Sequence, residues 1–286
     1  MKTTKYFFEF VIIIFLFLIF KIIGYKKASN FGEFIGKKFG PMFRSHKKIL
    51  ENLKNSNIGK SEQERNIMID KMWGNYGRIF AEYVYIKDFR EKNLNNNIEI
   101  NGKEFLEEIK KNNEPVIFIS GHFNNFELMA MTLEKSGIDL AAIYRPLNNK
   151  FLNPIMEKIR KKYICKKQIK KGISGTKDIL RFFKNGISVA LMIDQRVSEG
   201  ISCNFFNRKA LTTTIPAQFA KKFNCKIVPV YIERIEKYQF RIEIFKPIEF
   251  SQNESSEKTT LNLNVILENM IKKNPDQWIW THDRWK

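Results

Sequence analysis

The sequence has few of the residues that build metal centres and disulfides. Of its 286 residues, three are cysteine and three are histidine. Cys165, Cys203 and Cys225 lack the short spacing of a zinc or redox site, and any disulfide would leave one of them over. We expect three reduced thiols in a cytosolic domain. So few histidines also argue against a His-rich metal site, and we predict no bound metal.

Acidic residues are scarce relative to basic ones. The chain has 50 Lys and Arg against 30 Asp and Glu, a formal net charge of +20. A field of this sign concentrates anionic partners, which here means nucleic acid, anionic lipid headgroups or an acidic carrier protein. The lysines are spread along the whole chain, and no signature of a nucleic-acid-binding fold is present. We therefore expect no nucleic-acid partner.

The sequence also lacks internal repeats and long low-complexity linkers. Its first distinctive feature is an apolar segment at the amino terminus. Residues 6–24 read YFFEFVIIIFLFLIFKIIG, with an unbroken apolar run from Phe10 to Phe20. This reaches the length of a membrane helix if its flanking charges extend to the interface. A signal peptide and a buried core helix are the alternatives. No small-residue cleavage site follows, and the run is apolar on every side, so we predict an uncleaved anchor.

Basic residues follow this run at once, whereas only Lys2 and Lys5 precede it. Positive charge beside a membrane segment favours the cytoplasmic side and attracts anionic lipids, by roughly 1 kcal/mol per residue near the surface. We therefore expect the main domain in the cytoplasm, in contact with an anionic membrane surface. The basic residues that follow are Lys21, Lys26, Lys27, Lys37 and Lys38.

The rest of the chain divides into a helical part and an alternating part. Apolar residues at three- and four-residue spacing predict helices from about 31 to 88, whereas strands and helices alternate afterwards. We assign residues 1–27 to the anchor and its basic flank, 28–98 to a helical membrane-proximal region and 99–286 to an α/β domain. Such alternation predicts a central mixed, mostly parallel sheet flanked by helices. The predicted strands are 99–101, 116–120, 140–144, 187–193, 226–233 and 240–245, and the helices are 125–135, 151–163, 176–184, 215–223 and 259–273.

The strongest local signal directly follows the strand at 116–120 and reads GHFNNFE, residues 121–127. Ligand sites in open α/β sheets lie beyond the carboxyl ends of strands, which is where His122 stands. Glu127 follows in the first turns of the next helix. Its carboxylate can accept the Nδ1 proton of His122 and leave Nε2 to take a proton from a hydroxyl. A histidine that caps a helix is the structural alternative.

The GHFNNFE block resembles the H-x4-E motif of the lipid A biosynthesis (lauroyl/myristoyl) acyltransferase family, and four further segments match that family in order. They are YRP at 144–146 with Asn148 and Asn149, DQ at 194–195 with Gly200, FF at 205–206 with TTT at 212–214, and the terminus WIWTHDRWK at 278–286. Where the family often has glycine or tryptophan, this chain has Asn124, Phe126 and Asn207. Because these residues border the predicted site, the acceptor lipid and the acyl chain length stay open.

The resemblance implies a glycerolipid acyltransferase-like α/β fold and a role for each site residue. His122 would be the general base and Glu127 its orienting partner. Arg160 would stabilise the oxyanion of the tetrahedral intermediate, with a solvated basic helix face as the alternative. Arg145 could instead hold a phosphate of the acceptor, with the same solvated basic face as its alternative. Asp194 would position the arginines or the acceptor, unless it is only a turn or helix-cap residue.

The same resemblance implies an acyl-transfer reaction at the inner membrane. The donor would be an acyl thioester on acyl carrier protein, with no other cofactor. The acceptor would be a hydroxyl of a membrane lipid, either a lipid A precursor or, alternatively, a lysophospholipid or another glycolipid. A non-catalytic basic protein bound at the membrane surface is the remaining alternative, and the presence of both His122 and Glu127 disfavours it.

Overall fold

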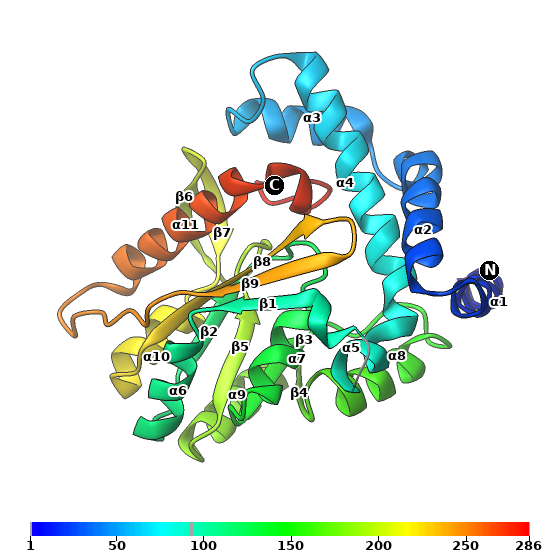
Figure 1. Cartoon of the computed structure of the whole chain (residues 1–286). Coiled ribbons are helices and arrows are strands. Elements are labelled where there is room, and N and C mark those ends of the chain that lie inside the picture. The colour runs from blue at the N-terminus through cyan, green and yellow to red at the C-terminus, as the bar shows by residue number, and fades with distance from the viewer. Residues whose placement is uncertain (1, 92–93, 286) are drawn as a thin grey trace.

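A computed structural model describes residues 2–91 and 94–285 and has a seven-stranded sheet at its centre (Figure 1). The strand order is β1-β9-β8-β2-β5-β3-β4. Neighbours are parallel except β8 and β9, which are antiparallel. The predicted mixed, mostly parallel sheet is therefore confirmed. Its strands are β1 (Ile98–Asn101), β2 (Ile117–Ser120), β3 (Leu140–Tyr144), β4 (Lys167–Lys170), β5 (Ser188–Met192), β8 (Ile227–Glu236) and β9 (Gln239–Ile244).

Helices cover this sheet, and a separate antiparallel hairpin packs against the last long helix (Figure 1). The hairpin consists of β6 (Ile201–Phe205) and β7 (Arg208–Thr212). The helices of the α/β part are α6 (Lys103–Asn112), α7 (Glu127–Lys135), α8 (Asn153–Ile159), α9 (Ile173–Lys184), α10 (Ile215–Phe223) and α11 (Ser256–Lys273). A π-helical turn, Arg160–Ile164, continues α8.

The central strands are buried on both faces, which explains why they are continuous apolar runs without alternation. All four residues of β2 are buried, and so are the first seven of β8. The sheet therefore supplies the rigid core from whose strand ends the site loops emerge.

The α-helices that precede the sheet lie along one side of it (Figure 1). They are α1 (Lys2–Ile23), α2 (Tyr25–Phe39), α3 (His46–Asn55) and α4 (Glu62–Glu82), followed by the short α5 (Ile86–Glu91). Helices α2 and α4 approach closely because glycines line their contact. A Cβ at Gly32 would lie 2.3 Å from the carbonyl oxygen of Gly77, and one at Gly36 would lie 2.1 Å from that of Trp73. The four short 3₁₀ turns are Gly40–Met42, Tyr83–Tyr85, Asn95–Asn97 and Pro275–Gln277.

A fully buried carboxylate, Glu82, ties α4 to three other parts of the fold. Arg234 on β8 donates two hydrogen bonds of 2.9 Å, one to each carboxylate oxygen. Ser29 of α2 donates at 2.8 Å and Asn125 of the loop after β2 donates at 3.2 Å. Four donor groups thus compensate one buried charge, and the loop that carries His122 is anchored to the helical region through Asn125.

We expect Glu82→Gln to lower the free energy of unfolding by roughly 3–5 kcal/mol, because it leaves the charge of Arg234 buried without its partner. Glu99→Gln is the matched control, since the pair of Glu99 with Arg241 has side chains 48% and 34% exposed. Such an exposed pair contributes at most about 1 kcal/mol. Denaturant unfolding of the two variants in the same detergent measures the difference, and equal losses would contradict this interpretation of the Glu82 network.

Candidate active site

His122 and Asp194 come together because they follow neighbouring parallel strands in the same register. Ser120 at the end of β2 pairs with Met192 at the end of β5, and each site residue lies two positions further on. The backbone N–H of Ile193 still bonds to the Ser120 carbonyl at 2.9 Å, so the two chains leave the sheet side by side. Both side chains therefore lie beyond the carboxyl ends of the strands, where α/β sheets place ligands.

Asp194 binds His122 at two points and is itself held by a third group. One carboxylate oxygen, Oδ1, lies 2.8 Å from Nδ1 of His122. The other, Oδ2, accepts the backbone N–H of His122 at 2.8 Å and the indole N–H of Trp278 at 2.9 Å. Burial alone would raise the pKa of Asp194, but His122 and these donors outweigh it and lower the pKa to about 2. An ionised carboxylate only accepts, so Nδ1 carries the proton and Nε2 the lone pair.

Glu127 is not the partner of His122, and our prediction of that contact is wrong. Its Oε1 accepts hydrogen bonds from Nε and Nη2 of Arg160, at 2.8 and 2.6 Å. Glu127 is the first residue of α7, and Phe126 before it packs edge-on against the His122 ring, with centroids 4.9 Å apart. Phe126 therefore lies against His122, and the carboxylate of Glu127 binds the buried guanidinium of Arg160 instead.

Arg160 has a buried donor beside Tyr83. Its Nη1 and the hydroxyl of Tyr83 each lack a well-formed hydrogen bond within the described residues, although the two side chains interact with each other. Burial raises the pKa of Tyr83, with Glu127 adding to the effect and Arg160 opposing it, so these three groups lie close together. Arg160 also lies over the ring of Tyr144, 5.7 Å from its centroid. Two buried donors next to each other can stabilise a developing negative oxygen.

The two predicted acceptor-binding residues lie in different surroundings. Asp194 is 2% exposed, and its carboxylate bonds to His122 and Trp278. It does not form the contact with an arginine that we predicted. Arg145 is exposed just beyond the end of β3 and forms no ion pair within the described part of the chain. Its guanidinium is therefore accessible to a ligand near the carboxyl ends of the same parallel strands.

Sequence reasoning missed the contribution of the C-terminal segment to this site. Besides the Trp278 bond to Asp194, a bridge joins Trp278 to Phe123, and the backbone N–H of Asn124 bonds to the Gln277 carbonyl at 2.9 Å. Arg284 is fully buried and donates at 2.7 Å to the Leu211 carbonyl on β7. The terminus thus braces the loop after β2 and the hairpin, and the tryptophans and arginine of the WIWTHDRWK segment were its only sequence signal.

Two departures from the family pattern have a conformational explanation. Asn124 has φ of 38° and Asn207 has φ of 57°, which are left-handed conformations that glycine and asparagine adopt most readily. Asn207 lies in the two-residue turn between β6 and β7. The side chain of Asn124 also bonds to Asn75 and Gln277, both at 2.9 Å. Asparagine therefore fits these turns and adds contacts that glycine lacks.

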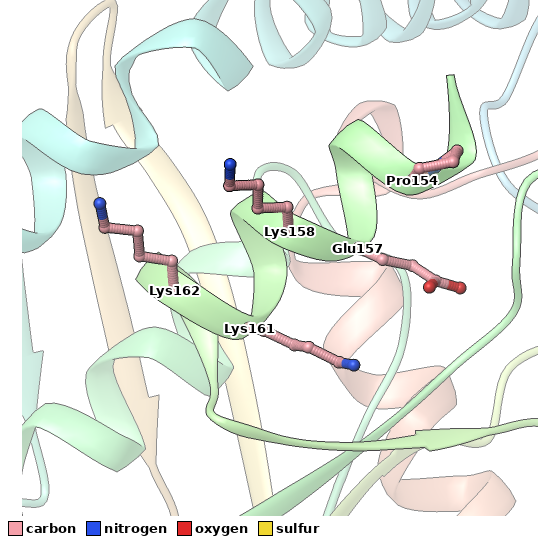
Figure 2. Close-up of a pocket in the computed structure, with 5 residues that line it drawn as sticks. All are labelled: Pro154, Glu157, Lys158, Lys161 and Lys162. Carbon is pink, nitrogen blue, oxygen red and sulfur yellow. The ribbon is translucent and has the colours of Figure 1, made fainter. Parts of the chain in front are cut away.

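A shallow basic hollow lies on the outside of the segment that carries Arg160. It is formed by Pro154, Glu157, Lys158, Lys161 and Lys162 and has a volume of about 460 Å³. Figure 2 shows Lys158 and Lys162 extending from one side of this helix, and Lys161 and Glu157 from another. The three lysines are exposed, whereas the side chain of Arg160 is only 12% exposed and lies against Glu127. One short segment thus presents lysines to solvent and an arginine to Glu127.

The cysteines take no part in this chemistry. All three are free, and burial raises the pKa of Cys165 and of Cys225 to about 12, so their thiols are protonated at neutral pH. No disulfide joins them in the described part of the chain, and their reduced state stays a prediction. Within residues 2–91 and 94–285, no group of three or more His, Cys, Asp or Glu side chains is placed to hold a metal ion.

Comparison with known proteins gives the same family along the whole chain. A family model described as bacterial lipid A biosynthesis acyltransferase matches residues 1–286. Lipid A biosynthesis acyltransferase 2 of Shigella flexneri is 24% identical over 225 residues, which cover 77% of this chain and 71% of that protein. The lipid A biosynthesis palmitoleoyltransferase of Escherichia coli K12 is 22% identical over 262 residues, 88% of this chain and 84% of that protein.

A second Escherichia coli K12 relative, the lipid A biosynthesis myristoyltransferase, is 20% identical over 239 residues, 82% of this chain and 73% of that protein. Among the described residues, α1 is long and apolar enough to cross a membrane, which fits a membrane-associated protein. The apolar helix α1 and the match over the full chain agree. The chain belongs to the bacterial lipid A biosynthesis acyltransferase family.

Proposed function

We propose that this protein transfers a fatty acyl group from acyl carrier protein to a hydroxyl of a lipid A precursor, with His122 as general base. The observation that carries the proposal is the His122–Asp194 pair at the strand ends, in which Nδ1 is held at 2.8 Å and Nε2 is left with its lone pair. This arrangement suits proton removal from a hydroxyl. Membership of the family supports acyl transfer as the reaction.

The proposed reaction proceeds through a tetrahedral intermediate. Nε2 of His122 takes the proton of the acceptor hydroxyl while that oxygen attacks the thioester carbonyl, and the carbonyl electrons move to its oxygen. Nη1 of Arg160 and the hydroxyl of Tyr83 are the buried donors available to the resulting oxyanion. Collapse of the intermediate reforms the carbonyl and releases the thiolate, which takes the proton back from His122. The step needs no cofactor besides the thioester.

Placement at the cytoplasmic face of the inner membrane is part of the same proposal. The basic residues that follow α1 attract anionic lipids, which give the cytoplasmic leaflet its negative surface potential. Acyl carrier protein and reduced thiols also belong to that compartment. Arg145, exposed at the sheet edge next to the site, is the residue we propose for a phosphate of the acceptor lipid.

The lysines of the α8 segment are the docking surface that we propose for the donor. Acyl carrier proteins are strongly acidic, and Lys158, Lys161 and Lys162 face solvent on the same segment whose Arg160 faces the site. A carrier bound there would lie near the group proposed to stabilise the oxyanion. Opposite charges across such a contact raise the association rate, and salt weakens them.

We expect Lys161→Glu/Lys162→Glu to raise KM for acyl carrier protein by roughly 10-fold at low salt and to leave kcat nearly unchanged. Its matched control is Lys221→Glu/Lys222→Glu, an equal charge change in the last turn of α10, which lies away from α8 in Figure 1. KM of the unmodified enzyme should rise with salt, and the difference between the two variants should shrink. Equal KM values in the two variants would contradict this docking surface.

The acceptor is tested separately, by lipid mass spectrometry of a host with and without the gene. We expect a lipid A species that is one acyl chain heavier when the gene is present. Incubation of the purified enzyme with acyl carrier protein thioester and a lipid A precursor should give the same product. A lysophospholipid that gains the chain instead would replace the acceptor and keep the reaction.

A further inference from the structure

Helix α1 has two apolar faces, and only one of them meets the rest of the protein. Phe10, Ile13, Phe17, Phe20 and Ile23 face the domain and pack against its core at helical spacing. The opposite face is exposed by 46–82% per side chain, although it is equally apolar. Its residues are Phe8, Val11, Ile12, Phe15, Leu18 and Ile22.

The domain holds α1 near both of its ends. Near the start, the side chain of Asn149 donates to the Tyr6 carbonyl at 2.8 Å, and Phe151 packs on Phe7 with centroids 5.7 Å apart. Near the end, Lys21 bonds to Asp88 at 2.8 Å. The helix therefore lies along the side of the domain and does not project away from it.

These contacts fix how α1 can meet a bilayer. Residues 7 and 21 are about 21 Å apart along a helix axis. If α1 crossed the membrane with residue 21 at one interface, residue 7 would lie about 21 Å deep in a hydrocarbon layer roughly 30 Å thick. The polar segment 149–151, which is bound to the start of α1, would lie at the same depth. Lys150 in that segment is exposed and charged, and charges at such depth are strongly disfavoured. We propose that α1 lies in the plane of the membrane surface, with the face from Phe8 to Ile22 in the hydrocarbon.

Helix α2 has an exposed aromatic and basic face of its own next to α1. Phe31 contacts Phe20 on the inner side of α1 with centroids 6.0 Å apart, and stacks on Phe34 at 6.5 Å. Both are exposed, as are Lys27 and Lys38, whereas the small residues of α2 face α4. Phenylalanines beside lysines on one helix face suit an anionic lipid surface, where the rings enter and the ammonium groups meet the headgroups. The occupant we assign to this surface is therefore an anionic bilayer.

Cysteine labelling tests the orientation of α1 and does not depend on enzyme activity. In full-length protein with Cys225→Ser, Thr3→Cys reports the start of α1 and Lys246→Cys reports the domain surface; Cys165 and Cys203 are buried. We expect a membrane-impermeant maleimide to label both positions from the same side of sealed vesicles. Labelling of the two positions from opposite sides would show that α1 crosses the bilayer and would overturn the proposal.

A charge placed on the outer face tests what covers it. We expect Phe15→Asp to weaken binding to vesicles of phosphatidylethanolamine and phosphatidylglycerol by roughly 10-fold to 100-fold. Val265→Asp on α11 is the matched control, since Val265 is 47% exposed and Figure 1 places α11 on the opposite side of the molecule. The control should change binding by less than about twofold. If Phe15→Asp instead splits a dimer in detergent and leaves vesicle binding unchanged, a second copy covers this face and the proposal is wrong.

Discussion

Replacement of His122 by alanine is expected to lower kcat by roughly 100-fold to 10,000-fold, the usual contribution of a general base. The side chain is 20% exposed and its Nδ1 is already bound by Asp194, so its removal takes away the proton acceptor at Nε2. KM for the donor should change little, because the basic α8 segment that we propose for the carrier is untouched. Steady-state kinetics with acyl carrier protein thioester and a lipid A precursor measure both constants.

His46→Ala is the matched control for this experiment. His46 is exposed at the start of α3, and its ring bonds to Asn66 at 3.0 Å and to no other side chain in the described part of the molecule. We expect its kcat to stay within about twofold of the unmodified enzyme. Thermal unfolding of His122→Ala should show a folded protein, so that the loss is chemical. A folded His122→Ala enzyme with near-normal turnover would contradict the proposed base.

The strands of the sheet could be predicted from the sequence because each is a short apolar run between turn signals. The predicted strands at 140–144 and 187–193 correspond to β3 and β5 (Leu140–Tyr144 and Ser188–Met192). The edge strand β4 was missed because its sequence, KQIK, is mostly polar and only Ile169 is buried. The hairpin β6–β7 was not predicted as strands either, since it packs against α11 and Arg284, which lie far along the chain.

The site could be predicted in part, and the limit was strand register. A sequence shows that His122 and Asp194 each follow a strand, but not that these strands are neighbours. The two strands are neighbours because Ser120 pairs with Met192, and this register places His122 and Asp194 next to each other. Glu127 was the nearer carboxylate along the chain, but it begins α7 and turns to Arg160. Distance along the chain was therefore a poor guide to the partner of the imidazole.

Asp194→Asn is the second change with a large expected effect, on the order of 100-fold to 10,000-fold in kcat. Two donors already point at Oδ2, the backbone N–H of His122 and the indole N–H of Trp278. The amide of the variant must present its carbonyl oxygen to them, since its NH₂ group would leave both donors unpaired. The NH₂ group then faces Nδ1 and donates to it. His122 is thereby forced to carry its proton on Nε2, where it has no lone pair to accept one.

Nuclear magnetic resonance of ¹⁵N-labelled histidine distinguishes this mechanism from a loss of packing. At neutral pH we expect the proton of His122 on Nδ1 in the unmodified enzyme and on Nε2 in Asp194→Asn. Glu127→Gln also removes one carboxylate charge, but from the ion pair with Arg160. It should leave the proton of His122 on Nδ1. If Glu127→Gln moves the proton and Asp194→Asn does not, Glu127 orients the base after all.

Acid stability gives an independent readout of the same carboxylate. The folded pKa of Asp194 is about 2, because the charge of His122 and the three hydrogen bonds outweigh burial, whereas an unfolded aspartate titrates near 3.9. The stability from this depressed pKa is present above about pH 4 and is lost as the pH falls towards 2. The unmodified enzyme should therefore lose about 2 kcal/mol more than Asp194→Asn across that window, as measured by denaturant unfolding. Equal losses would mean that Asp194 is not held as an ionised partner of His122, and the base would then lack the group that fixes its proton on Nδ1.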